Sequence, residues 1–74
     1  MQSAQAQQWR LDLARAELHI TQGAEHILRQ RKLIAELRQD HHVTGLAEDL
    51  LGALLESQAL HEQHRARLLR QMES

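Results

Sequence analysis

Apolar side chains recur along this chain with the period of an α-helix in two long segments, which a short polar stretch separates. The first segment covers about residues 4 to 40 and the second covers about residues 45 to 73. In the first, from residue 13 onward, one position of a seven-residue repeat holds a large aliphatic side chain each time. These side chains are Leu13, Ile20, Ile27 and Ile34. The pattern therefore predicts two long helices.

The stretch between the two segments predicts a loop at about residues 41 to 44. Its two histidines are poor helix-interior residues, because a ring side chain loses rotamer freedom against the preceding turn. Thr44 can cap the next helix, and Glu48 places negative charge near the positive end of that helix. A loop of this length favours antiparallel neighbours. We therefore expect an all-α fold in which residues 1–74 form one domain, an antiparallel two-helix hairpin.

A helix break near Gly23 would produce a different fold. Thr21 could cap a new helix, and glycine costs about 1 kcal/mol relative to alanine in a helix interior. The alternative is a three-helix bundle, with helices at about residues 4–21, 24–40 and 45–72. The isoleucine repeat passes through Gly23 without a change of phase, which favours one continuous helix. On that interpretation Gly23, like Gly52 in the second helix, lets another helix approach closely.

The apolar residues are spread too widely around both helices for a single hairpin to bury them. Leu11, Leu18 and Leu28 lie beside the isoleucine repeat, and the start of the second helix is apolar almost all round. Contiguous exposed apolar surface usually marks an association site. We therefore expect two hairpins to dimerise into a four-helix bundle, or one hairpin to dock on a helical protein partner. The residues expected at these interfaces are Leu13, Ile20, Ile27, Ile34, Leu37, Leu50, Leu51, Leu54, Leu55 and Leu68.

Folding the chain about His42 predicts which residues of the two helices lie opposite one another. On this register Ile27 meets Gln58 and Ala24 meets His61. The register also brings His26 within about one turn of His61.

The composition of the 74 residues narrows the function further. Nine Lys and Arg against ten Asp and Glu give a formal charge of −1, which argues against nucleic acid as a partner. No apolar run approaches the roughly 18 residues that a membrane span needs, and the polar start of the chain lacks the pattern of a signal peptide. We expect a cytoplasmic protein with no membrane partner. The chain has no Cys, no glycine-rich phosphate loop and no serine in a nucleophile elbow, so we expect a non-enzymatic interaction or structural protein without a cofactor.

Histidine is the chemically suggestive residue type, with six in the chain. His61 and His64 are three positions apart on one face of the second helix, and His26 is expected across the hairpin from them. Imidazoles that converge in this way could bind Zn²⁺ or gain charge in mild acid. A histidine-based metal-binding or pH-sensing helical module is therefore the alternative function. The main prediction assigns no metal site, because one chain does not assemble four ligands.

Two segments of the chain resemble a known group of proteins. They are His26-Ile27-Leu28-Arg29-Gln30-Arg31-Lys32-Leu33-Ile34-Ala35-Glu36-Leu37 and Ser57-Gln58-Ala59-Leu60-His61. The first is similar to an H-I-x-R-Q-R-x-I-I-x-x-L helix found in small uncharacterised alphaproteobacterial proteins, in which a short loop and a second helix around Q-x-L-H follow. Leu28 and Leu33 depart from that pattern. The resemblance covers most of residues 18 to 70 and implies a helical hairpin of bacterial, cytoplasmic origin, without an activity to transfer.

Overall fold

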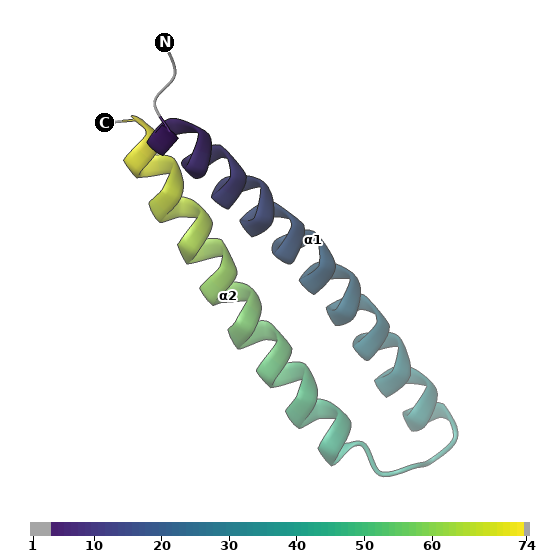
Figure 1. Cartoon of the computed structure of the whole chain (residues 1–74). Helices are drawn as coiled ribbons and strands as arrows, with labels where there is room; N and C mark the ends of the chain where they lie inside the picture. Colours follow the sequence, from purple (N-terminus) through teal and green to yellow (C-terminus); the bar gives the residue numbers. More distant parts are fainter. Residues whose placement is uncertain (1–3, 74) are drawn as a thin grey trace.

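The computed structural model describes residues 4–73, which form a hairpin of two α-helices. Helix α1 is Ala4–Gln39 and helix α2 is Gly45–Glu73. The helices run antiparallel, and their outer ends lie next to each other (Figure 1). The predicted all-α hairpin is confirmed, and the described residues include no strand. Because α1 continues through Gly23, the three-helix alternative is wrong.

The last turn of α1 closes with a left-handed residue rather than with glycine. The backbone N–H of His42 donates to the carbonyl of Leu37 at 2.8 Å, and that of His41 donates to the carbonyl of Arg38 at 3.1 Å. His41 has a φ of 60°, so these bonds form the Schellman closure that usually contains glycine. This closure stops α1 one residue before the predicted end of the helix.

Helix α2 begins at Gly45, directly after Thr44, the residue that the sequence indicated as its cap. The carbonyl of Thr44 accepts the first hydrogen bond of the helix, from the N–H of Glu48 at 2.8 Å. Glu48 also lies in the first turn, where negative charge is favourable. The chain therefore reverses direction over residues 40–44.

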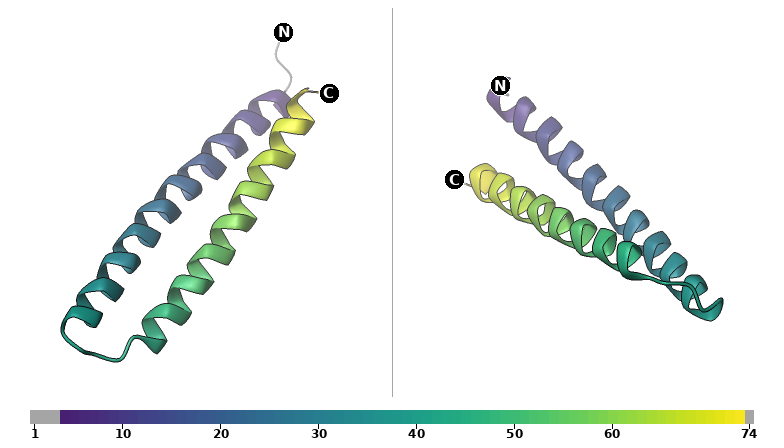
Figure 2. Two further views of the ribbon diagram at one scale, coloured as in Figure 1. Left: turned by 180° about the vertical axis from the view of Figure 1, so that it is seen from behind. Right: turned by 90° about the horizontal axis from the view of Figure 1, so that it is seen from below.

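The hairpin is long and thin. It extends over 61 × 14 × 13 Å, and its radius of gyration is 17.2 Å. A compact domain of this length would have a radius of gyration of about 11 Å. The two further views show that the helices are inclined to one another (Figure 2). The buried and half-buried residues lie mainly along one side of each helix. Every other side of each helix therefore lacks a neighbour within the hairpin.

The two helices meet along a row of buried or half-buried residues that we call the seam. Seam residues follow one another at steps of three and four, the spacing that keeps one helix face towards a partner. On α1 they are Ala6, Trp9, Leu13, Ala16, Ile20, Gly23, Ile27, Gln30, Ile34 and Leu37. On α2 they are Ala47, Leu51, Leu54, Gln58, His61, Arg65, Leu68 and Met72. Among residues 4–73 only three apolar side chains are less than a tenth exposed, and these are Ala16, Ile34 and Leu68.

Candidate functional site

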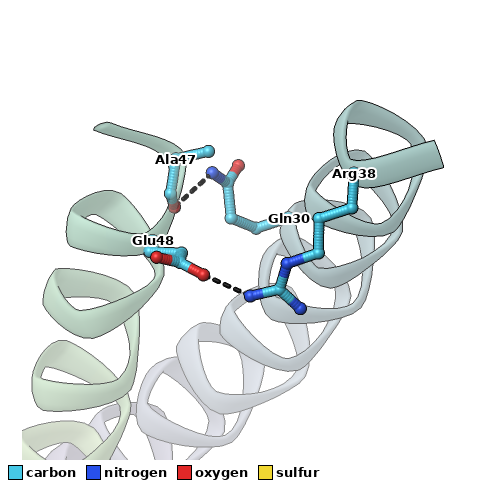
Figure 3. Close-up of polar contacts among 4 residues, drawn as sticks. All are labelled: Gln30, Arg38, Ala47 and Glu48. Atoms are coloured by element: carbon cyan, nitrogen blue, oxygen red, sulfur yellow. Dashed lines mark hydrogen bonds and ion pairs between the residues drawn. The ribbon is translucent and has the colours of Figure 1, made fainter. Parts of the chain in front are cut away.

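Two glutamine side chains cross the seam and bond to the backbone of the opposite helix. Gln30 is 9% exposed, and its Nε2 donates to the carbonyl of Ala47 at 2.9 Å (Figure 3). In the opposite direction, Nε2 of Gln58 donates to the carbonyl of Ile20 at 2.7 Å. Each bond requires one amide and one carbonyl to lie at the same height along the hairpin. Together they specify how the helices are aligned, because a buried amide without its partner costs about 1 to 3 kcal/mol.

Gly23 makes room for one of these amides. A Cβ atom at Gly23 would lie 2.0 Å from Oε1 of Gln58, which is far inside van der Waals contact. That oxygen is buried and has no hydrogen-bond partner among the described residues. The absence of a side chain at Gly23 thus admits the Gln58 amide into the seam, in agreement with the predicted close approach at this glycine. Gly52 differs, because nothing lies within 4 Å of the point that a Cβ atom there would occupy, so the prediction of a close contact is wrong for the single hairpin.

The alignment differs from the predicted register by about one helical turn. Gln58 lies against Gly23 and Ile20 rather than Ile27, and His61 contacts His19 rather than Ala24. At this height the expected register was wrong, because it was centred on the loop alone. Nearer the loop, Ile34 and Leu51 line one cleft, in keeping with that register. Opposite Ile27 the Gln58 amide would meet a branched side chain, whereas opposite Gly23 it has space.

Two ion pairs connect the helices, one near the loop and one further along. Arg38 pairs with Glu48 (Figure 3), and Nε of Arg65 lies 3.4 Å from Oε1 of Glu17. All four side chains are roughly half exposed. Water screens such pairs, and each contributes about 0 to 1 kcal/mol.

On one side of the seam the surface is formed by small and aliphatic side chains, and we call it the alanine flank. A shallow cleft on this side is lined by Arg31, Ala35, Arg38 and Glu48 beside Ile34. Steps of four and seven from these residues continue the same side along both helices. The small and apolar residues of the flank are Ala14, Ala24, Leu28 and Ala35 on α1, and Gly52, Leu55, Ala59, Ala66 and Leu69 on α2. Leu28 is 68% exposed and Leu55 is 42% exposed, so the flank presents apolar surface to water.

The opposite side carries four histidines, and we call it the histidine flank. Two neighbouring clefts share His19 and His61, and His26 lines one of them while His64 lines the other. The rings of His19 and His61 have centroids 5.2 Å apart and planes inclined at 48°. This flank also contains exposed leucines, among them Leu50 and Leu60. It therefore combines exposed leucines with titratable imidazoles, whereas the alanine flank combines small apolar side chains and leucines with charged residues at its edge.

The predicted metal ligands are only partly brought together. His61 and His64 share a cleft, but His26 lines the other one, and the closest imidazole to His61 is that of His19. Between residues 4 and 73 no three His, Asp or Glu side chains form a group that could hold a metal ion. The sequence missed His19 because the expected register placed Ala24 at that height. The spacing of seven between His19 and His26 places both on one face of α1, but it does not give the height at which that face meets His61.

Eight of the ten predicted interface residues lie in the seam within one chain. The two exceptions are Leu50 and Leu55, which are 51% and 42% exposed and lie on opposite flanks. The described chain exposes further large apolar side chains that the predicted set left out. These are Leu11, Leu18, Leu28, Leu33, Val43, Leu46 and Leu60. The positions beside the seam residues in the helical repeat already indicate most of them.

Comparison with models of protein families, with curated proteins and with solved structures found no match to this chain. The resemblance to alphaproteobacterial hairpin proteins therefore stays a prediction. Neither described helix is long and apolar enough to cross a membrane.

Proposed function

We propose that this chain is a non-enzymatic interaction protein that works as a homodimer, in which two hairpins pack as a four-helix bundle. One observation carries the proposal. Nine large apolar side chains are exposed in the described hairpin, whereas three apolar side chains are buried. Water disfavours that distribution by about 25 cal/mol for each Å² of apolar surface, and association removes the cost.

The exposed area has the size that a dimer of this kind requires. The hairpin exposes 5829 Å² of surface for a mass of 8.6 kDa. A compact monomer of that mass exposes about 4,700 Å². The excess is roughly 1,100 Å² for each chain, so two chains could bury about 2,200 Å², which falls in the range of obligate homodimers.

The alanine flank suits the contact between two copies. Its alanines and Gly52 allow helix backbones to approach closely, and Leu28 and Leu55 can insert between them. The open space around Gly52 has no explanation within one hairpin, but it suits a site where a second copy packs. The charged residues at the edge of the flank include Arg31 and Glu62, which offer opposite charges to a second copy.

Sedimentation equilibrium of the full chain over a wide concentration range tests the proposal. We expect a species of twice 8.6 kDa at micromolar concentration, with an unfolding temperature that rises as the chain concentration is raised. A folded monomer whose unfolding temperature is independent of concentration would contradict the dimer. It would leave a helical protein partner as the occupant of the same surface.

A further inference from the structure

Two imidazole rings, one from each helix, lie next to each other on the histidine flank. His61 is half-buried at the seam of α2, and His19 is exposed on α1. Their ring centroids are 5.2 Å apart, and the planes are tilted rather than stacked. Both rings line the same two clefts, which are open to solvent. The pair is therefore accessible to a small ion from water.

The spacing of the rings matches a shared metal ion. When two imidazoles bind one tetrahedral metal through nitrogens at about 2.0 to 2.1 Å, their ring centroids lie roughly 5 Å apart. Metal-binding histidines generally engage the second ring nitrogen in a hydrogen bond. Here the hydroxyl Oγ of Ser57 lies 3.4 Å from Nε2 of His61, which leaves Nδ1 as the nitrogen for a metal.

We propose that His19 and His61 bind a divalent transition metal ion, with Cu²⁺ and Zn²⁺ as the preferred ions, and so link α1 to α2. The protein supplies two imidazole nitrogens, and water fills the remaining positions, in keeping with the absence of any three-ligand group among residues 4–73. Imidazole suits both ions, and Cu²⁺ binds most tightly among the divalent ions of its row. Asp12 and Arg15 line one of the clefts with opposite charges, so selectivity rests on the imidazoles.

Binding at this site has a consequence for stability. The two rings come together only when the helices pair, so a metal ion binds the folded hairpin more tightly than the unfolded chain. Such a ligand raises the free energy of unfolding by RT ln(1 + [L]/Kd), where [L] is the free metal concentration, and so raises the unfolding temperature. The site is independent of the proposed dimer contact, because it lies on the opposite flank.

The test is calorimetric titration of the full chain with CuCl₂ and with ZnCl₂, followed by thermal unfolding with and without each ion. The variants are His19→Gln and His61→Gln, and the control is the double variant His41→Gln, His42→Gln, which removes two histidines at the loop. We expect each single variant to weaken Cu²⁺ binding by at least about tenfold, because one of two ligands is lost, and the control to bind as the parent does. Because His19 is exposed, the His19→Gln variant keeps the fold even if His61→Gln does not.

Electron paramagnetic resonance of the Cu²⁺ complex identifies the ligands directly. The parent should show coupling to two imidazole nitrogens, and each single variant should show coupling to one. Equal loss of binding in the loop control would overturn the proposal, as would an unchanged unfolding temperature with metal. Loss of a nitrogen in a His26→Gln or His64→Gln variant, with none lost in His19→Gln, would overturn the assignment of the ligands.

Discussion

The two flanks of the hairpin are built from the same two helices, but they differ in what they can do. The alanine flank presents small side chains and leucines and little hydrogen-bonding capacity beyond the charges at its edge. The histidine flank presents imidazoles, a serine hydroxyl and solvent-open clefts, with leucines such as Leu60 between them. Apolar side chains on both sides share a cause, because the seam uses only one face of each helix. The comparison shows that amphipathic patterning sets how much surface is left over, while the residues between the leucines determine what that surface recognises.

The largest expected effect is on dimerisation, when charged residues replace leucines on one flank or on the other. Replacing Leu28 and Leu55 together by Glu places two charges on the alanine flank. We expect the dimer dissociation constant to rise by at least about 100-fold, since each buried leucine contributes roughly 1.5 kcal/mol. The matched control is Leu50→Glu with Leu60→Glu on the histidine flank, where the leucines are similarly exposed, at 51% and 64%. Sedimentation that finds both pairs equally disruptive would remove the distinction between the flanks.

A smaller effect is expected from added bulk at Gly52. In the hairpin alone this position is open, and leucine is the better helix former by somewhat less than 1 kcal/mol. If a second copy packs closely there, Gly52→Leu weakens association by about tenfold or more although it strengthens the helix. Ala53→Leu adds a similar side chain on the histidine flank and should leave association unchanged. Unchanged association of Gly52→Leu would place the contact elsewhere.

The Gly23 and Gln58 contact lies in the seam, beside the histidine flank, and its coupling energy measures how strongly it aligns the two helices. In the parent, Gly23→Ala gains helix propensity but displaces the Gln58 amide, so we expect little net change in the free energy of unfolding. In a Gln58→Ala background the same substitution should stabilise the protein by about 1 kcal/mol. Denaturant unfolding of the four proteins gives the coupling energy, which we expect to be about 1 kcal/mol. A coupling near zero would mean that the amide tolerates a methyl group beside it.

The smallest effect is expected at the polar edge of the alanine flank. Arg38→Ala removes the ion pair with Glu48 and should lower the free energy of unfolding by no more than about 0.5 kcal/mol, because both side chains are solvent-exposed. Arg29→Ala, which removes an exposed arginine of α1 outside this cleft, is the control. The difference between the two variants should be smaller at high salt than at low salt, because salt screens exposed ion pairs. A loss of stability above about 1 kcal/mol would mean that Arg38 makes further stabilising contacts besides its exposed ion pair with Glu48.

Local features of the sequence predicted the elements well. The isoleucine repeat ran through Gly23, and Thr44 marked the start of α2, so helix bounds and the antiparallel arrangement followed from information within a few residues. The pairing of the helices did not follow in this way. It depends on where the Gln30 and Gln58 amides find carbonyls and on where a glycine leaves space, and these are relations between residues far apart in the chain.

The closure of α1 and the candidate metal pair were missed for similar reasons. His41 adopts the left-handed conformation that glycine or asparagine usually supplies, so its type gave no indication of its role. His19 could be recognised as a partner of His61 only after the alignment of the helices was known. The spacing of residues within one helix indicates which face they share. It does not determine how two helices are aligned along their length.

The side-chain amides of Gln30 and Gln58 both donate to backbone carbonyl oxygens, which every amino acid has. The side chains at Ala47 and Ile20 take no part in those two bonds. Either residue can therefore be replaced, within the limits of packing, without loss of the hydrogen bond that aligns the helices. Substitutions at the two acceptor positions therefore leave the hydrogen bonds in place, whereas substitutions of the two donor glutamines remove them. Descendants of this chain should keep glutamine at 30 and 58 long after the residues across from them have diverged.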